Sequence, residues 1–121
     1  VRKGLAALIN FAPDLMVCGE SDTVDGGLAC IAREQPDVAV VDLALGTESG
    51  LDLVASLAAS APALPVLMLS MHDETLHAER AIAAGARGYI MKHEARQDLI
   101  EAIRAVAHGA TYFSPRLRAR I

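Results

Sequence analysis

The sequence contains no tryptophan, and its aromatic residues are only two tyrosines and two phenylalanines. A surface that binds nucleic acid by stacking on the bases needs exposed aromatic rings beside a basic groove. The 121 residues carry 15 acidic side chains against 11 lysines and arginines, which gives a formal charge of −4 at pH 7. This balance also argues against tight binding to a phosphate backbone. The two shortages together argue against a nucleic-acid-binding platform in this segment.

Cysteines and long hydrophobic runs are scarce as well. No apolar stretch approaches the length of about 20 residues that a membrane-spanning helix needs, and no charged start leads into a signal-like apolar stretch. Cys18 and Cys30 form no CxxC pair and have no histidine pair nearby, which argues against a metal site. We therefore expect both cysteines to be reduced and buried, in a cytoplasmic protein that does not enter a membrane.

Hydrophobic segments typical of strands alternate with segments of helical periodicity, over a length that suits one domain. The expected helices cover residues 1–11, 23–35, 51–59, 73–84 and 95–108, and the expected strands cover residues 15–18, 38–41, 66–70 and 88–91. Residues 46–50 are expected as a loop, and Gly85 and Gly109 are expected to end two helices. Strands separated by helices in this way predict an α/β fold with a doubly wound parallel sheet, covered by helices on both faces.

Both ends of the chain carry helical patterns. The sequence begins at Val1, without a methionine and within an amphipathic pattern, so we expect it to start inside a domain. Ser114 and Pro115 are typical of the N-cap and first position of another helix. We therefore assign residues 1–110 to one domain that is incomplete at its N-terminus, and residues 111–121 to the start of a linker helix.

Three polar residues end three successive hydrophobic strands: Asp42, Ser70 and Lys92. Each residue alone is more typical of a strand-end cap or a solvated loop. In a parallel sheet, however, the carboxyl ends of the strands open into the same crevice. A carboxylate, a hydroxyl and an ammonium there can act as a nucleophile, a donor to a phosphoryl oxygen and a positive partner for anionic charge. The pattern predicts a site that accepts a phosphoryl group.

The segments around these residues resemble the receiver domains of bacterial two-component response regulators, in the NarL/LuxR branch. VAVVDLALGTESGLDLV is similar to the strand and loop around the phosphorylated aspartate, LMLSMHDE to the segment with the switch hydroxyl, and AGARGYIMKHEARQDLIEAIRAVAHGATYFSP to the last strand and helix. The resemblance covers nearly the whole chain and implies a flavodoxin-like, CheY-like three-layer fold. It implies that Asp42 is the phosphoacceptor, that Gly50 is the loop glycine, and that Ser70, Lys92 and Tyr89 bind the phosphoryl group or switch.

The resemblance also implies an Mg²⁺ site. In this sequence its ligands would be the Asp42 carboxylate and the backbone carbonyl of Ala44, whereas the acidic pair at the end of the family's first strand would lie upstream of Val1. We expect that strand to precede this sequence rather than to be lost. Removing a central strand would leave its neighbours in the sheet with unpaired backbone groups.

The implied function is a phosphorylation-dependent change of a protein interface. A sensor histidine kinase would supply the phosphoryl group, the domain would form a homodimer, and a DNA-binding helix-turn-helix domain outside this chain would control transcription. No enzyme activity is expected beyond phosphotransfer to Asp42 and its slow autodephosphorylation.

Two alternatives stay open. A degenerate pseudoreceiver would serve only for dimerisation or docking, and the acidic pair upstream of Val1 would distinguish it. An enzyme of small-molecule metabolism has less support, because the chain has no glycine-rich phosphate loop and no cofactor motif.

Overall fold

The computed structural model describes residues 2–45, 48–70, 75–91 and 95–113. These ranges hold a parallel sheet in the order β1-β4-β5, made of β1 (Ala39–Asp42), β4 (Val66–Ser70) and β5 (Gly88–Met91). The helices are α1 (Arg2–Phe11), α2 (Val24–Glu34), α3 (Gly50–Ser60), α4 (Thr75–Ala84) and α5 (Ala95–Ala107). The expected α/β fold with a parallel sheet is confirmed.

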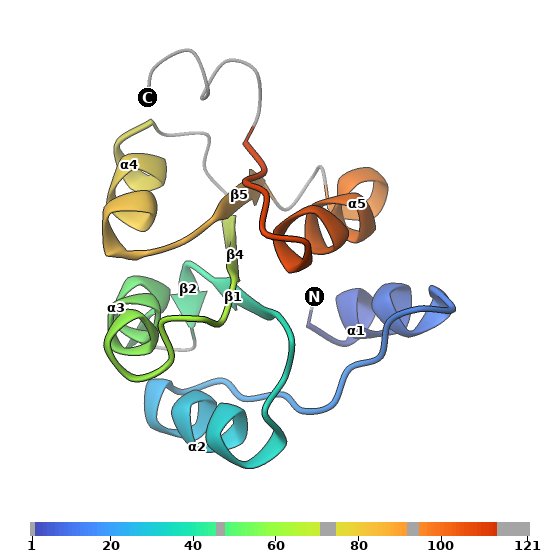
Figure 1. Ribbon diagram of the computed structural model, residues 1–121, viewed down its shortest axis with the longest axis horizontal. Helices are drawn as coiled ribbons and strands as arrows, with labels where there is room; N and C mark the ends of the chain where they lie inside the picture. Colours follow the sequence, from blue (N-terminus) through green and yellow to red (C-terminus); the bar gives the residue numbers. More distant parts are fainter. Residues whose placement is uncertain (1, 46–47, 71–74, 92–94, 114–121) are drawn as a thin grey trace.

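Helices cover both faces of the sheet, which gives three layers (Figure 1). On one face, α1 and α5 pack over a core cluster that includes Leu67 and Leu69 of β4. On the other face, α3 and α4 pack over a second cluster that includes Val66 and Met68, with α2 beside α3. Successive side chains of β4 thus alternate between the two clusters, and the whole strand is buried, as expected for a strand of a parallel sheet.

The strand β1 is less buried than its continuous hydrophobic run predicts. Ala39 and Val41 are buried, but Val38 and Val40 are only half-buried. In the described ranges β1 pairs with β4 alone, so it is an edge strand there. One side of an edge strand lacks the neighbour that would cover its side chains, and this explains the incomplete burial.

The strand predicted at residues 15–18 is wrong. This segment has no regular structure, and the Val17 N–H donates to Oδ1 of Asn10 at 2.8 Å rather than to a strand carbonyl. A hydrophobic run becomes a strand only where a partner offers backbone hydrogen bonds, and none of the described strands pairs with this segment. The expectation of two buried cysteines is also wrong, because Cys18 is exposed and Cys30 is half-buried; both are free thiols.

Capping residues mark the helix ends: Thr23, predicted as the first residue of its helix, is instead the N-cap, and the predicted glycine stops at Gly85 and Gly109 are confirmed. The Thr23 hydroxyl accepts a hydrogen bond from the Gly26 N–H at 2.9 Å and caps the start of α2. Gly85 and Gly109, which follow α4 and α5, have φ angles of 121° and 88°. This left-handed region is open to glycine at little steric cost. Every predicted helix end that the structure describes agrees to within one residue.

An ion pair joins the turn after α1 to α5. Arg104 donates to Asp14 through Nε at 2.9 Å and through Nη2 at 2.7 Å, one bond to each carboxylate oxygen. This hydrogen bond from Arg104 is the main cause that lowers the pKa of Asp14 below its usual value. The pair thus connects the turn that follows α1 to α5, and both helices cover the same face of the sheet.

Replacing Asp14 with asparagine is expected to destabilise the domain slightly at pH 7. Because folding lowers the pKa of Asp14, its contribution to stability is present above the unfolded pKa and disappears as the pH falls through the folded value. The difference between the parent and the variant should therefore begin to shrink as the pH falls below about 4, the usual pKa of an aspartate, and vanish only below the lowered folded pKa. Denaturant unfolding at pH 7 and pH 3 would measure this difference. A double-mutant cycle with Arg104→Gln should give a coupling that also weakens in high salt, and a coupling unchanged by pH would contradict the assignment.

Candidate functional site

The register of the sheet brings the ends of β1, β4 and β5 to one edge. Asp42, the last residue of β1, lies opposite Leu69, and Ser70, the last residue of β4, lies opposite Met91 at the end of β5. Lys92 follows Met91 directly in the sequence and lies outside the described residues. Asp42 and Ser70 therefore end adjacent strands, and Lys92 follows the end of the third strand in the sequence. These strand ends form the carboxyl edge of the sheet, where open α/β sheets bind their ligands.

Two backbone hydrogen bonds fix the chain immediately after Asp42. The Leu43 N–H donates to the Leu69 carbonyl at 2.8 Å, and the Gly50 N–H donates to the Leu43 carbonyl at 2.8 Å. The first bond extends the β1–β4 ladder by one residue, and the second ties that ladder to the start of α3. The Asp42 side chain is thus carried by a rigid backbone and is half-buried. Such a support limits the rearrangement needed when a group approaches the carboxylate.

Gly50 lies directly against the backbone of Asp42. A side-chain carbon built on Gly50 would overlap the Asp42 carbonyl oxygen and would lie 2.8 Å from its carbonyl carbon. Backbone atoms in a ladder cannot move aside as the end of a flexible side chain can. The structure therefore gives a steric reason for glycine at the position that the sequence predicts as the loop glycine.

The loop predicted at residues 46–50 is only partly correct. Residues 46–47 lie outside the described residues, but β3 (Glu48–Ser49) pairs antiparallel with β2 (Ala44–Leu45), and Gly50 already begins α3. The short pairing satisfies backbone groups that a loop would leave to water. The Ser49 hydroxyl accepts from the Leu51 N–H at 3.2 Å and caps α3.

Replacing Gly50 with alanine is expected to lower the free energy of unfolding by about 1–3 kcal/mol, because the added carbon must displace the Asp42 backbone. Gly27→Ala is a matched control. There the new carbon would meet Cδ2 of Leu53 at 3.1 Å, the end of a flexible side chain, and α2 would gain helix propensity. Urea unfolding of both variants would compare them, and an equal effect of the two substitutions would contradict the steric argument.

Ser70 and Tyr89 lie on the same face of the sheet. Ser70 is completely buried, and Tyr89 is 5% exposed. Tyr89 belongs to the same core cluster as Val66 and Met68 of β4, so the alternation along β4 assigns Ser70 to that face too. Met68 lies opposite Tyr89 in the register, which puts Ser70 two residues further along the neighbouring strand. Ser70 and Tyr89 are therefore buried on the same side of the sheet, on neighbouring strands.

The described residues do not complete a metal site. No group of three or more histidine, cysteine, aspartate or glutamate side chains gathers among them. Asp42 supplies one carboxylate, and Ala44 lies in β2 opposite Ser49. Mg²⁺ in proteins is held by one or two carboxylates together with other oxygen ligands, so the described residues supply only part of such a site.

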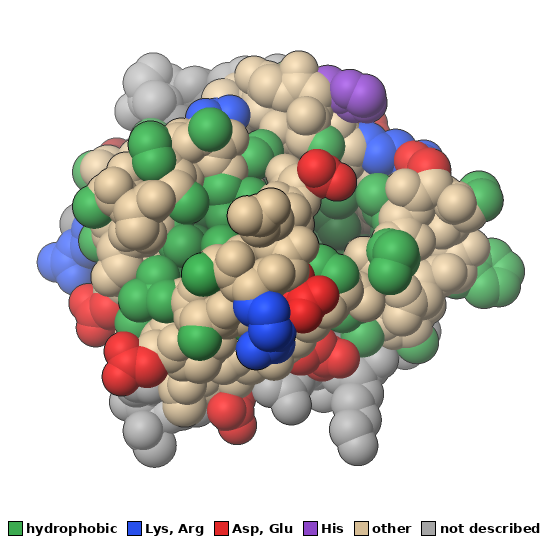
Figure 2. Space-filling model, turned by 60° about the horizontal axis from the view of Figure 1, so that its bottom comes forward, with side chains coloured by type: hydrophobic (Ala, Val, Ile, Leu, Met, Phe, Trp, Pro, Cys, Tyr) green, Lys and Arg blue, Asp and Glu red, His purple; other side chains and the backbone are tan. Residues whose placement is uncertain are grey.

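Charged side chains do not form a basic patch on the face drawn in Figure 2, where acidic and basic groups are scattered. Arg33 pairs with Glu34 at 2.9 Å, which neutralises one of the cations. Within the described ranges, none of the helices combines the length and apolar character that crossing a bilayer requires.

Two aromatic residues without a predicted role lie beside Tyr89. Tyr112 forms an isolated parallel bridge with Gly88, and Phe113 is buried in the core cluster that contains Tyr89. The predicted linker helix that begins at Ser114 lies outside the described residues. One signal in the sequence could have indicated this packing. Two of the four aromatic residues in the chain, Tyr112 and Phe113, are adjacent and lie shortly after the helix stop at Gly109.

Comparison with known families and curated proteins identifies the class. Residues 1–104 match the family of the response regulator receiver domain, and the chain belongs to that family. It is 34% identical to the oxygen regulatory protein NreC of Staphylococcus carnosus and 35% identical to the transcriptional regulatory protein UhpA of Escherichia coli K12. These matches cover 97% and 95% of this chain but 54% and 57% of the relatives, so the chain spans about half their length. The relatives are regulators of the NarL/LuxR type.

Solved structures support the same fold. A two-component response regulator of the LuxR family from Aurantimonas sp. SI85-9A1 superposes with a TM-score of 0.91 at 28% identity, over 98% of this chain and 85% of that one. The receiver domain of the response regulator NarL from Mycobacterium tuberculosis gives a TM-score of 0.83 at 28% identity, over 89% of this chain and 87% of that one. The predicted resemblance and fold class are thereby confirmed.

Proposed function

We propose that this receiver domain accepts a phosphoryl group on Asp42 and uses it to change a protein interface. The observation that carries the proposal is the register of the sheet. Asp42 and Ser70 end adjacent strands, and Met91, which lies opposite Ser70, is followed by Lys92. A carboxylate, a hydroxyl and an ammonium at one sheet edge are the groups that phosphotransfer to a protein side chain needs.

The proposed reaction is nucleophilic displacement at phosphorus. A carboxylate oxygen of Asp42 forms the new P–O bond while the P–N bond to the imidazole of a kinase phosphohistidine breaks, and the released nitrogen keeps the electron pair of that bond. A later attack by water on the acyl phosphate releases inorganic phosphate and restores the carboxylate. The chain's contribution is to hold the Asp42 backbone rigidly through Leu43 and Gly50.

The proposed switch involves both faces of the sheet. Alternation along β1 assigns Asp42 to the face of Val40, opposite the face of Ser70 and Tyr89. The Ser70 hydroxyl would move toward a phosphoryl oxygen, and the face on which Tyr89 packs would adjust. Lys92 would pair with Asp42 before transfer and with the phosphoryl oxygens afterwards. Two populated states with different faces around α4, β5 and α5 then suffice to change an interface.

The wider role follows from the relatives. We propose that a sensor histidine kinase supplies the phosphoryl group in the cytoplasm, that Mg²⁺ supports the transfer with Asp42 and the Ala44 carbonyl among its ligands, and that the altered interface forms a homodimer. We also propose that residues 1–110 form the receiver, that 111–121 begin a linker, and that a DNA-binding helix-turn-helix domain outside this chain controls transcription. The family to which the chain belongs and the names of its relatives, UhpA among them, support this role.

Acetyl phosphate with Mg²⁺ tests the proposal on the full-length protein that contains this chain. We expect a mass increase of one phosphoryl group, its removal by hydroxylamine as for an acyl phosphate, and its location on the peptide that contains Asp42. Absence of any label under these conditions would favour the alternative, a pseudoreceiver that only docks or dimerises.

A further inference from the structure

Residues 110–113, here called the edge strap, lie along the free edge of β5. The Tyr89 N–H donates to the Tyr112 carbonyl at 2.9 Å, and the Tyr112 N–H donates to the Arg87 carbonyl at 3.0 Å. These two bonds make the parallel bridge between Tyr112 and Gly88. Tyr89, the predicted switch residue, is therefore bonded to the edge strap through its own backbone.

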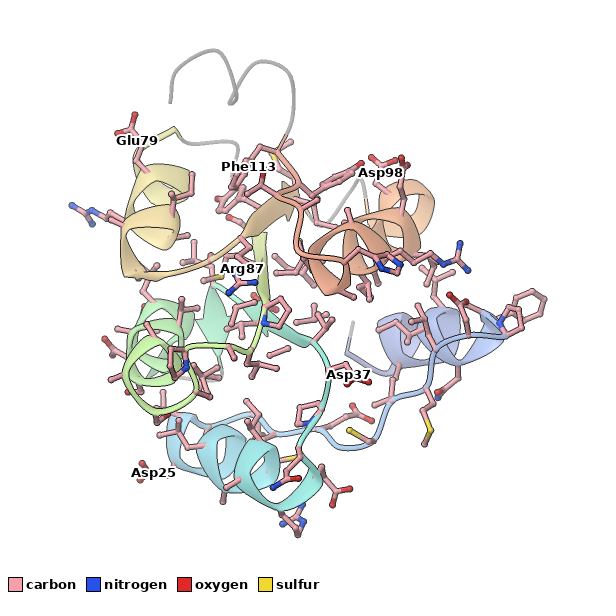
Figure 3. The ribbon with its side chains drawn as sticks, in the orientation of Figure 1. Asp25, Asp37, Glu79, Arg87, Asp98 and Phe113 are labelled. Atoms are coloured by element: carbon pink, nitrogen blue, oxygen red, sulfur yellow. The ribbon has the colours of Figure 1, made fainter. Side chains whose placement is uncertain are left out.

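The side chains of the edge strap lie on both faces of the sheet. Tyr112 packs against the core cluster under α1 and α5, whereas Phe113 is buried, at 9% exposure, in the cluster under α3 and α4. Figure 3 shows Phe113 where the strap passes β5, on the side of α4. This alternation is that of a strand at a sheet edge, and it puts the Phe113 ring into the same cluster as Tyr89.

Two glycines allow this close approach. A side-chain carbon on Gly88 would lie 2.6 Å from Cδ1 of Leu67 and 3.3 Å from the Tyr112 carbonyl oxygen, so glycine leaves room for the strap beside β5. Gly109, with its positive φ, turns the chain after α5, and the Ala110 N–H then donates to the Ala105 carbonyl at 3.0 Å. The edge strap is thus anchored to α5 at one end and to β5 at the other.

We propose that the edge strap holds Tyr89 in its buried position, and that Phe113 is a positioning residue for this switch. The proposal rests on the proposed role of Tyr89. Tyr89 is linked to the strap by a backbone hydrogen bond and shares a buried core cluster with Phe113, so a change in the packing of its ring would change the packing of the strap. A conformational change caused by phosphorylation of Asp42 would then be transmitted through this strap to the chain that follows Phe113.

The scarcity of aromatic residues supplies a specific probe. In a Tyr112→Phe background Tyr89 is the only tyrosine, there is no tryptophan, and the backbone bonds of residue 112 are kept. Quenching of tyrosine fluorescence by acrylamide then reports the exposure of Tyr89 alone. Phe113→Ala is the test variant, and Phe11→Ala is its matched control because Phe11 is 89% exposed. The measurement is made on this chain, or on a longer protein that contains it once any further tyrosine or tryptophan there has been replaced.

Without a phosphodonor, Phe113→Ala is expected to increase the quenching of Tyr89 several-fold, whereas Phe11→Ala leaves it unchanged. After acetyl phosphate treatment, the control should show a change in Tyr89 quenching and faster hydrogen exchange at the residue 112 amide, and Phe113→Ala should lose the change in quenching while Asp42 is still labelled. If the alanine variant does not unfold cooperatively, Phe113→Leu replaces it as the test variant, because leucine keeps most of the apolar volume. Its quenching should then exceed that of the Phe11→Ala control, by less than is expected for Phe113→Ala.

Two results would overturn the proposal. One is a folded Phe113 variant in which Tyr89 is quenched as in the control, and the other is a phosphorylated control in which Tyr89 changes while exchange at residue 112 does not. Failure of the proposed function is a separate result, because it appears as missing label on Asp42, whereas the quenching comparison without a phosphodonor does not depend on labelling.

Discussion

Asp42→Asn is expected to abolish labelling by acetyl phosphate. The amide has no negative charge and is a poor nucleophile, so the bond to phosphorus does not form. No other described carboxylate ends a strand of the sheet at its carboxyl edge. Mass measurement of the intact protein should therefore show the parent gaining one phosphoryl group and the variant gaining none under the same conditions.

Asp37→Asn is the matched control for this loss. Asp37 is exposed and precedes β1, so it lies at the opposite end of the strand from Asp42, as Figure 3 shows for the labelled residue. This variant should be labelled as the parent is. Both substitutions are nearly isosteric, so both variants should keep the parent's cooperative thermal unfolding. Label that persists in Asp42→Asn, or that is lost in Asp37→Asn, would contradict the assignment of the phosphoacceptor.

The central and last strands of the described sheet could be predicted because their continuous hydrophobic sequences indicate burial on both faces. The run at 66–70 is hydrophobic at successive positions, which is typical of a strand covered on both faces, and β4 is fully buried. The run at 15–18 has the same character but forms no strand. Pairing depends on which segments become neighbours in space, and a short run of residues does not encode that by itself.

Contacts made at long range explain what the sequence did not reveal near the site. Gly50 could be identified by resemblance, but its reason lies in the Asp42 backbone, which only the folded chain brings against it. The position of Phe113 depends on β5 and on the second core cluster, both distant from it along the sequence. Alternation along a strand, in contrast, is local, so it assigns Ser70 and Tyr89 to one face as soon as the register is known.

Lys92→Ala is expected to separate phosphorylation from its consequence. Lys92 follows Met91, which lies opposite Ser70, and the resemblance gives Lys92 a role in binding the phosphoryl group, so we propose that its ammonium acts at this strand end. An ammonium there balances the charge of the phosphoryl oxygens and, by pairing with them, stabilises the switched state. Without it, Asp42 should still be labelled, although more slowly, while the switched state loses its advantage over the resting state.

Sedimentation equilibrium of the full-length protein, with and without acetyl phosphate, would measure this coupling. Allosteric couplings of about 1–3 kcal/mol correspond to changes in affinity of about 5- to 150-fold, and we expect the parent's dimer affinity to change within that range. In Lys92→Ala the change should fall below about twofold, a loss of most of that coupling. Lys92→Arg should restore little of it, because a planar guanidinium does not replace a compact ammonium at a confined site.

Arg87→Ala supplies the control for the lost charge. Arg87 precedes β5, at the end of that strand away from Lys92, and its Nη2 lies 3.5 Å from the Pro62 carbonyl oxygen, far from the carboxyl edge. Its removal changes the net charge by the same amount, so a general electrostatic effect on dimerisation would appear in both variants. If Lys92→Ala tightens its dimer on phosphorylation as strongly as Arg87→Ala does, Lys92 is a solvated strand-end residue, and the phosphoryl group must be sensed by Ser70 and the backbone around Asp42 alone.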